Sequence, residues 1–418
     1  MAGAWTAREA DALEGALGHR RRGEAKRQLL EAQAQWLRAV GGGKDTTPPS
    51  DADQVLDSLA AYVLSETDEG LRDSIDLVRA AHLHGRAAVL DVLVRVGYWD
   101  VDENLILHRE QIPQVFTEQA EQLAAGLAAT RPIWRGWPNW SQPSIGVSDE
   151  TDSEICLRAW AVRRRREGWR LRLHVALPCL RLTPDGPLAE EISGRGIRVD
   201  LPDQTLPLIP PGLLRAASFT TLEYRPALTV IVDVDASGDL AKAQLRRSRI
   251  RLSARVSPSE NQNAVPSDVV GLVSAFRQRR QRDGGWEGLG GQWFVQATGG
   301  DVACGRSNTE NAHTIDHELH RLGEEALAAI CAREHVVAVH RSRMPAVTPT
   351  EPWPQMPQDG AALFRRWQME GHCASAGLQL EATPHAGDGT GPRALGLDPG
   401  GSSAELIMQR QLLCLVGV

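Results

Sequence analysis

A series of strand-like segments between residues 144 and 260 constrains the fold more than any other feature of the sequence. Apolar or β-branched residues alternate with polar ones in the segments ICLRAWAV, WRLRLHVAL and RPALTVIVDVDASGDL. This two-residue period is typical of strands that bury one face. The Asp-Ala-Ser-Gly run inside the last segment is a turn signal between the two strands of a hairpin. The sequence therefore predicts a β-sheet in the middle of the chain.

Helical segments precede and follow the predicted sheet. Residues 4–40 place leucines and tryptophans at helix-compatible spacing, and Ser50 or Asp51 can cap a further helix after a proline-containing loop. Residues 269–282 and 312–334 are also predicted to be helical, and the first of these ends at an Asp-Gly-Gly stop signal. A chain of 418 residues exceeds the usual size of one domain, so we expect two domains. The predicted fold class is α+β.

The composition is that of an ordinary globular protein, with 42% hydrophobic and 24% charged residues. The net charge of −7 does not indicate a nucleic-acid-binding protein, although local arginine clusters can still create a basic surface. The six cysteines form no Cys-x-x-Cys pair, which favours reduced thiols over a disulfide framework or a zinc site. Neither an apolar signal core nor an apolar run long enough to cross a membrane occurs. We therefore expect a cytoplasmic protein.

Three consecutive stretches between residues 142 and 210 carry a resemblance to a known family. SIGVSDETDSEICLRAWAV leads from an acidic run into a strand, LRLHVALPCLRL adds a second strand, and GRGIRVDLPDQTLPLIPPGLL is punctuated by prolines. This order resembles the RNB catalytic domain of the ribonuclease II/R family. That family has an Asp-x-Asp-Asp-Ala-Leu run, a Val-His-Ile-Ala-Asp strand and a Tyr-Leu-Pro segment. Its later signature, Thr-Ser-Pro-Ile-Arg-Arg-Tyr-Ala-Asp-Leu, is similar to LDPGGSSAEL near the end of the chain.

The resemblance implies an RNB-type mixed β-sheet flanked by helices, without a C-terminal OB barrel. A mostly helical N-terminal domain precedes it, either a helix-turn-helix or winged-helix module or a plain helical cap. We expect the helical domain at residues 1–128, a linker rich in tryptophan and proline at 129–143, and the RNB-like domain at 144–418. Aromatic residues beside arginines can stack bases. The linker tryptophans are nevertheless more typical of side chains that pin two domains together.

RNB enzymes hydrolyse RNA from its 3′ end and hold Mg²⁺ with four aspartates. Mg²⁺ requires several hard oxygen ligands in octahedral geometry. The four residues that align with these aspartates are Ser144, Glu150, Asp152 and Ser153. Only Glu150 and Asp152 therefore remain as candidate metal ligands. A register shift would bring in Asp149 or Glu154, but a one-residue slip turns a strand side chain to the other face.

Two further family positions have changed. Gly401 stands where the family has an arginine that contacts the scissile phosphate, and only a planar cation supplies bidentate recognition there. Asp200 stands where the family has a tyrosine that stacks on a base, and an aspartate repels phosphate. These losses fall at separate functional points while the apolar residues between them persist. We therefore expect hydrolysis to be weak or lost.

Clusters of arginine indicate that RNA binding can survive this loss, because phosphate contacts require only cations. The candidate RNA-binding residues are Arg163, Arg164, Arg165, Arg166, Arg246, Arg247 and Arg249. The sequence thus predicts an RNB-family protein that acts on or binds single-stranded RNA, with room for a protein partner. Two alternatives stay open. One is an active Mg²⁺-dependent 3′→5′ exoribonuclease with a rearranged acid cluster, and the other is a regulatory scaffold that does not bind RNA.

Three histidines share one face of the helix predicted at residues 312–334. His313, His317 and His320 are spaced at i, i+4 and i+7, which can suit a transition metal. No His-Glu-x-x-His motif accompanies them. The spacing therefore favours a solvated or hydrogen-bonded histidine face over a metal site.

Overall fold

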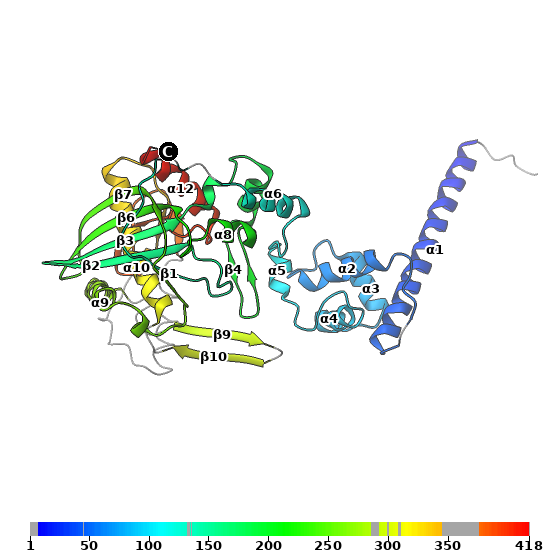
Figure 1. The fold of residues 1–418 in the computed structure, drawn as a ribbon. Coiled ribbons are helices and arrows are strands. Elements are labelled where there is room, and N and C mark those ends of the chain that lie inside the picture. The colour runs from blue at the N-terminus through cyan, green and yellow to red at the C-terminus, as the bar shows by residue number, and fades with distance from the viewer. Residues whose placement is uncertain are drawn as a thin grey trace, which may run out of the picture. The chain divides into compact units, whose positions relative to one another are not determined.

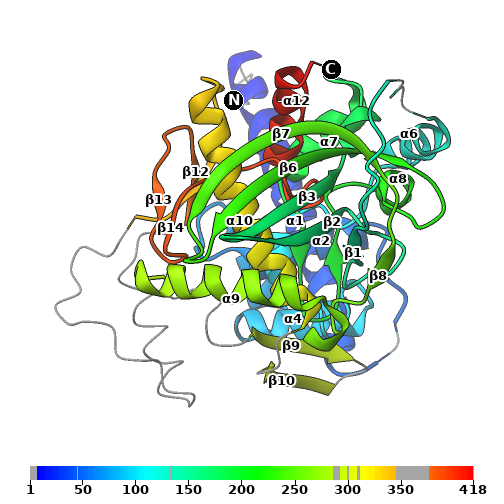
Figure 2. The ribbon, with the colours of Figure 1, turned by 60° about the vertical axis from the view of Figure 1, so that its left-hand side comes forward.

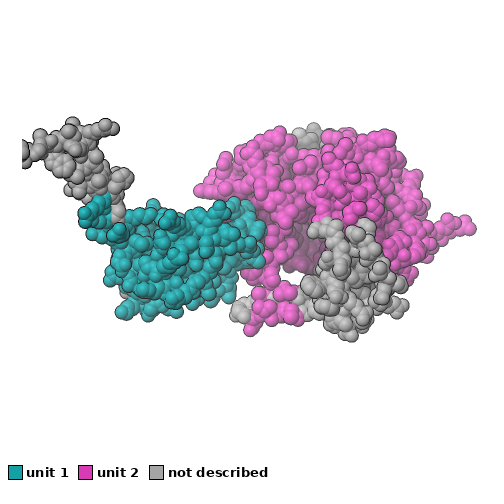
Figure 3. Space-filling view, turned by 180° about the vertical axis from the view of Figure 1, so that it is seen from behind, with its two compact units in different colours: residues 1–114 teal, residues 115–418 magenta. Residues whose placement is uncertain are grey.

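The chain divides into two compact units, residues 1–114 and 115–418, which Figure 3 colours separately. Each unit has a hydrophobic core of its own. The computed structural model of the protein describes residues 7–44, 46–131, 134, 136–285, 292–298, 301–307, 311–344 and 376–417.

Helices build the first unit (Figure 1). They are α1 (Ala7–Gly41), α2 (Ala52–Leu64), α3 (Arg72–Ala80), α4 (Gly85–Arg95) and α5 (Leu105–Arg109). Their apolar faces meet in a core that includes Leu37, Leu59 and Leu93. Asp51 precedes α2 as predicted, but its carboxylate accepts a hydrogen bond from Gln33 (2.7 Å) and caps no first-turn amide. The described residues of this unit contain no strand that could form the wing of a winged helix.

A six-stranded sheet forms the centre of the second unit. Its strands are β1 (Ile145–Val147), β2 (Arg158–Arg165), β3 (Gly168–Ala176), β6 (Arg225–Asp235), β7 (Leu240–Ile250) and β8 (Ala254–Val256). They lie in the order β7-β6-β3-β2-β1-β8. All neighbours pair antiparallel except β1 and β8, which pair parallel. The prediction of a mixed sheet with a hairpin between β6 and β7 is confirmed.

Two long helices cover one face of this sheet (Figure 2). Helix α9 (Ser267–Arg282) packs on β2 and β3, and α10 (Ala312–Arg333) packs on β6 and β7. The strands present Leu171, Leu173 and Val175 to this core, because alternate residues of a strand point to the same side. A Cβ at Gly323 of α10 would lie 2.5 Å from the Leu173 side chain, so a glycine is required where the helix approaches the sheet.

Shorter elements complete the second unit. The helices are α6 (Glu118–Ala129), η1 (Pro178–Leu180), α7 (Pro187–Arg195), α8 (Pro211–Ala217), η2 (Gln262–Ala264) and α12 (Ser403–Leu415). The strands are β4 (Val199–Asp200), β5 (Thr205–Leu206), β9 (Gln292–Thr298), β10 (Asp301–Ser307), β11 (His340–Ser342), β12 (Gly377–Gln379), β13 (Pro384–His385) and β14 (Thr390–Ala394). No helix among the described residues is both long enough and apolar enough to cross a membrane.

Residues 115–131, 134 and 136–143 pack as part of the second unit, although the sequence assigned this region to the helical domain and a linker. Helix α6 contacts α7 and α8, and Arg181 donates hydrogen bonds to the carbonyls of Leu127 (3.0 Å) and Ala128 (3.3 Å) at its end. Trp137 is 5% exposed and belongs to the main core. Trp140 packs against a smaller cluster beneath the sheet. The unit boundary therefore falls at Gln114, ahead of the predicted one at residue 128.

Replacing Trp137 tests whether this segment belongs to the core. We expect Trp137→Ala to lower the free energy of unfolding by about 3–5 kcal/mol, the usual cost of removing a buried tryptophan. Urea denaturation followed by circular dichroism measures it. Leu222→Ala is the matched control, because Leu222 is 85% exposed and its loss should have little effect. An equal, small effect of both substitutions would show that the segment is a loosely attached linker.

Candidate functional site

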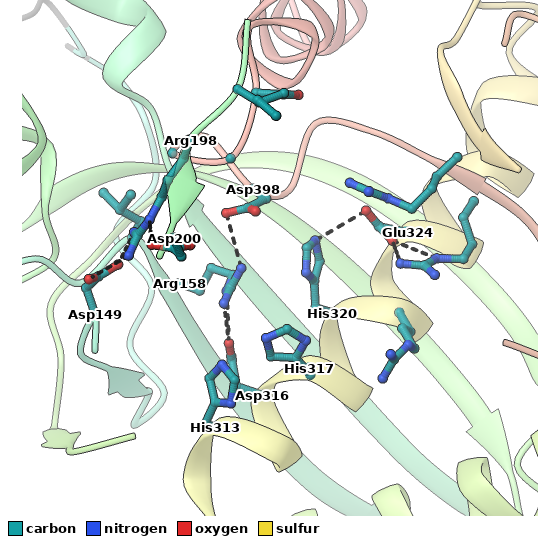
Figure 4. Close-up of a pocket in the computed structure, with 18 of the residues that line it drawn as sticks. Asp149, Arg158, Arg198, Asp200, His313, Asp316, His317, His320, Glu324 and Asp398 are labelled. Carbon is teal, nitrogen blue, oxygen red and sulfur yellow. Dashed lines mark hydrogen bonds and ion pairs between the residues drawn. The ribbon is translucent and has the colours of Figure 1, made fainter. Parts of the chain in front are cut away.

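A cavity of about 740 Å³ lies in the second unit, between the start of β2, one face of α10 and the segment that precedes α12 (Figure 4). This volume is typical of a site for a small organic ligand or a nucleotide. The cavity is lined by charged side chains of both signs. Its arginines are Arg158, Arg198, Arg321, Arg341, Arg343 and Arg393, and its acids are Asp149, Glu150, Asp200, Asp316, Glu324 and Asp398.

The acidic run after β1 reaches the cavity through Asp149, which pairs with an arginine. Asp149 Oδ2 lies 2.5 Å from Arg198 Nη1, and Arg198 Nε also binds Asp200 (2.8 Å). Partial burial opposes ionisation of Asp149, but the hydrogen bonds from Arg198 outweigh it and lower the pKa of this carboxyl. Asp149 is therefore ionised and already neutralised by a guanidinium.

Two of the five predicted site residues line the cavity. Glu150 Oε1 lies 3.5 Å from His313 Nε2, and the Glu150 side chain is largely exposed. Gly401 also lines the cavity. A Cβ at Gly401 would lie 2.3 Å from Asp398 Oδ2, so no side chain fits there while Asp398 keeps its place. An arginine at this position would require the Asp398 carboxylate to move away.

The other three predicted residues do not line the cavity. Asp152 pairs with Arg215 (2.7 Å), and the carbonyl of Ser153 accepts a hydrogen bond from Arg255 (2.8 Å). Ser144 is 1% exposed, and its hydroxyl lies 3.2 Å from His174 Nε2. At these three positions, alignment with the family aspartates did not identify residues that line the cavity. The direction of the chain at the end of β1 decides which side chains turn toward the cavity.

Arg158 occupies the centre of the cavity wall between two carboxylates, as Figure 4 shows. Its Nη2 lies 2.7 Å from Asp316 of α10, and its Nη1 lies 3.3 Å from Asp398. Burial disfavours the charged guanidinium, but the two carboxylates outweigh this effect and raise the pKa of Arg158. The residue is therefore a fixed cation that joins β2, α10 and the segment before α12.

The three histidines of α10 point into the cavity (Figure 4). The rings of His313 and His317 contact each other edge to face, with centroids 4.3 Å apart. Loss of solvation inside the cavity lowers the pKa of His317 well below the ordinary histidine value, and neighbouring cationic groups lower it further. Burial also lowers the pKa of His320. The predicted histidine face is thus a cavity wall, and two of its imidazoles, those of His317 and His320, are uncharged at neutral pH.

A third carboxylate pairing closes the inner end of the cavity. Glu324 accepts hydrogen bonds from Arg393, one of them 2.7 Å long, and lies 3.4 Å from His320 Nε2. Glu405 at the start of α12 is almost fully buried nearby. Burial, with the charges of Glu324 and Asp398, raises the pKa of Glu405 to about 8. Glu324 is ionised and Glu405 holds a proton at neutral pH.

These carboxylates do not fit a Mg²⁺ ion. Five of the six cavity acids pair with Arg198, Arg158 or Arg393, and the sixth, Glu150, lies beside His313 and is largely exposed. Mg²⁺ takes several free oxygen ligands in octahedral geometry. Within the part of the chain that the structure describes, no group of three or more His, Cys, Asp or Glu side chains is arranged to hold a metal. The cavity is organised by arginine–carboxylate pairs.

The arginines predicted to bind RNA lie on the sheet and do not line the cavity. Arg163, Arg165 and Arg246 are exposed on β2 and β7. Arg164 stacks on the ring of Trp169 (4.1 Å), and Arg247 donates a hydrogen bond to the carbonyl of Gly417 (2.6 Å). Arg166 is exposed in the turn after β2, and Arg249 is half-buried near the end of β7.

Sequence reasoning missed four residues that dominate the cavity: Arg158, Arg198, Glu324 and Asp398. A fifth, Asp316, lies among the three histidines of the predicted helix. Asp398 directly precedes the Pro-Gly-Gly run that aligns with the second family signature, so a nearby acid could have been included. The other three depend on contacts between residues far apart in the chain.

Most of the second unit matches a known protein family. A model of the RNB domain matches residues 142–351, half of the chain. The chain belongs to the RNB family. A double HTH domain model matches residues 14–105, which confirms the helix-turn-helix prediction for the first unit.

Curated RNB-family relatives are much longer than this chain. Ribonuclease II, chloroplastic/mitochondrial, of Arabidopsis thaliana is 26% identical over 266 residues, which are 59% of this chain and 33% of that protein. An uncharacterised ribonuclease of Synechocystis sp. is 26% identical over 179 residues, 42% of this chain and 27% of that protein. The chain therefore spans about a third or less of the length of these relatives.

Solved structures confirm the RNB-type α+β fold. An active-site mutant of the Dss1 exoribonuclease from Candida glabrata matches 92% of this chain and 57% of its own, with a TM-score of 0.68 and 14% identity. Mycoplasma genitalium RNase R in complex with ribose-methylated single-stranded RNA matches 74% of this chain and 56% of its own, with a TM-score of 0.62 and 14% identity. Yeast Ssd1, a pseudonuclease, matches 80% of this chain and 46% of its own, with a TM-score of 0.54 and 13% identity.

Breaking the central pair should destabilise the protein. Arg158→Gln leaves Asp316, which is 1% exposed, without its cation, so we expect the free energy of unfolding to fall by about 3–5 kcal/mol. The double variant Arg158→Gln/Asp316→Asn removes the unpaired charge and should recover most of that loss. Urea denaturation measures both. If the double variant is as unstable as the single one, the Arg158–Asp316 pair does not explain the loss.

The raised pKa of Glu405 predicts a pH-dependent stability. Between about pH 4.5 and 8 the unfolded chain has released this proton and the folded chain still holds it, so stability falls as pH rises through this window. Glu405→Gln keeps a neutral group and an oxygen that accepts from the Gly396 amide. The variant should therefore gain Tm relative to the wild type between pH 5 and pH 8 in calorimetry. A difference in Tm that is the same at both pH values contradicts the assignment.

Proposed function

We propose that this chain binds single-stranded RNA in the cavity of the second unit and that its Mg²⁺-dependent 3′→5′ hydrolysis is weak or lost. The observation that carries this proposal is the pairing of the cavity acids with arginines. Asp149 is held by Arg198, and Arg158 holds both Asp316 and Asp398. A metal ion would have to compete with these guanidinium groups for the carboxylates.

The cavity suits an anionic strand better than a metal. Arg341 lines the cavity, and its side chain is 40% exposed. Its Nη2 atom lies 3.7 Å from Glu405 Oε1, which is longer than a hydrogen bond. Glu405 holds a proton and so does not neutralise Arg341, although the ionised Glu324 also interacts with this guanidinium. His317 and His320 line the same cavity, are uncharged, and offer flat ring faces and hydrogen-bonding nitrogens. Related proteins support the partner, since Mycoplasma genitalium RNase R has been solved with single-stranded RNA.

Hydrolysis requires more than RNA binding. In metal-assisted cleavage a bound cation lowers the pKa of water and supplies the attacking hydroxide. A guanidinium cannot do this, because it has no open coordination position and holds its protons at every physiological pH. Gly401 adds to this deficit, since it supplies no cation for the scissile phosphate. The RNB fold is also found in yeast Ssd1, which is described as a pseudonuclease.

A binding and cleavage assay tests the proposal. Purified protein is mixed with 5′-labelled single-stranded RNA, with Mg²⁺, Mn²⁺ or EDTA, and resolved on native and denaturing gels. We expect a complex that weakens as salt rises, because phosphate contacts release counterions. The RNA length should stay the same under every condition. Arg341→Gln should weaken binding several-fold, and Arg282→Gln, an exposed arginine of α9 outside the cavity, should not.

The same gels decide between the alternatives. Mg²⁺-dependent shortening of the RNA would establish the active exoribonuclease and refute the loss of hydrolysis. In that case Asp152→Asn would test whether the aligned acid acts, although its pairing with Arg215 predicts no effect. The absence of any RNA complex would support the regulatory scaffold and refute RNA binding.

A further inference from the structure

The central sheet has a second face, opposite α9 and α10, that carries a concentration of positive charge. Alternation along each strand sends Leu171 and Leu173 toward the helices and sends Arg170 and Arg172 the other way. The pairing register places further cations on the same side. They are Arg163 and Arg165 of β2, and Lys242 and Arg246 of β7. We call these six residues the outer cationic face.

Few carboxylates balance the outer cationic face. Asp233 of β6 lies on it and binds Arg170 through two hydrogen bonds of 2.5 and 2.6 Å. Asp235, at the end of the same strand, accepts hydrogen bonds from the backbone amides of the following turn. Arg163 and Arg170 are direct cross-strand partners, and like charges in that arrangement destabilise a sheet. The folded state therefore keeps an excess of positive charge on this face.

Arg172 at the centre of the face has an unusual environment. It is 7% exposed, and its Nε and Nη1 atoms have no hydrogen-bond acceptor among the described residues. The guanidinium lies 5.3 Å from the centre of the Trp140 ring. Burial lowers the pKa of Arg172, and the neighbouring cations Arg170, Arg163 and Arg165 lower it further. Two of its donors are thus buried without an acceptor, an arrangement that costs free energy unless an anion comes close enough to supply one.

Trp140, the aromatic residue beside Arg172, is held in place by its neighbours. The backbone amide of Trp140 donates a hydrogen bond to the carbonyl of Arg249 (2.8 Å) at the sheet edge. The Trp140 ring rests edge-on against His174 (5.6 Å), and His174 Nδ1 is bonded to Thr229 (2.8 Å). Thr229 is bonded in turn to Ser248 (2.6 Å). This buried row fixes the tryptophan beside Arg172, so the site is formed before any ligand arrives.

We propose that the outer cationic face binds the phosphate backbone of single-stranded RNA, at a second site separate from the cavity. None of its six cations lines the cavity. They spread over three strands, about 7 Å apart along β2 and along β3 and about 14 Å apart along β7, so they fit an extended polyanion better than a single small anion. A flat lipid surface does not reach the recessed Arg172, whereas a flexible strand can place a phosphate there. The inference rests on the proposed function for the identity of the ligand.

RNA length and matched variants test the second site. The double variant Arg163→Gln/Arg246→Gln removes two exposed cations, and a triple variant adds Arg172→Gln. Affinity for a three-nucleotide RNA, which fits the cavity alone, should match that of the wild type. Affinity for a twenty-nucleotide RNA should fall several-fold in the double variant and further in the triple variant. The slope of log K against log salt should decrease by about 0.7 for each removed contact. Arg282→Gln should change neither the affinity for the twenty-nucleotide RNA nor the salt slope.

The outcomes separate this inference from the proposed function. If the wild type binds neither RNA, the proposed function fails and the second site fails with it. If the wild type binds both RNAs and the double variant keeps the full affinity and salt slope for the long RNA, only the second site is refuted. Sedimentation with phosphatidylserine vesicles tests whether an anionic lipid surface binds the outer cationic face instead. A loss of vesicle binding in the double variant, with RNA binding intact, would refute RNA as the occupant of this face.

Discussion

Helix α10 organises the second unit through acidic side chains that each take an arginine from another element. Asp316 pairs with Arg158 of β2, Glu318 with Arg280 of α9, Glu324 with Arg393 of β14, and Glu325 with Arg279 of α9. Such buried pairs add little net stability compared with apolar contacts, but breaking one leaves a costly unpaired charge. Their main consequence is register. The helix can rotate or slide along the sheet only by separating several pairs at once.

The same pairs decide the chemistry of the cavity. Carboxylates that point inward from β1, α10 and the segment before α12 are the oxygen donors that a metal would need. Each of the innermost carboxylates instead pairs with a guanidinium. That positive charge is part of the chain, so it does not leave the site as a hydrated ion does. The arrangement stabilises the fold at the position where metal-assisted hydrolysis would require open coordination. Under the proposed function, this arrangement retains positive charge for phosphates and lacks the open coordination that activates water.

The sequence predicted the parts that depend on local patterns. Alternation in WRLRLHVAL gave β3 and the identity of its two faces, and the i, i+4, i+7 spacing placed three histidines on one face of α10. It did not predict which way that face points, because this depends on the packing of α10 against the sheet. Arg158 and Asp316 are separated by 158 positions, so no local pattern joins them. Ser144 and Asp152 aligned with family acids, yet the turn after β1 directs Asp149 inward instead.

The two faces of the sheet show how charge can be placed without affecting the core. A net charge of −7 argued against a nucleic-acid partner, but net charge does not describe its distribution. Packing under α9 and α10 constrains only the inward positions of β2 and β3. The outward positions were free to be neutral, and Arg163, Arg170 and Arg172 stand side by side there at an electrostatic cost to the folded state. Arg172 contacts the Trp140 ring, but its Nε and Nη1 atoms have no acceptor among the described residues, and the proposed RNA site would supply an anion beside this cation.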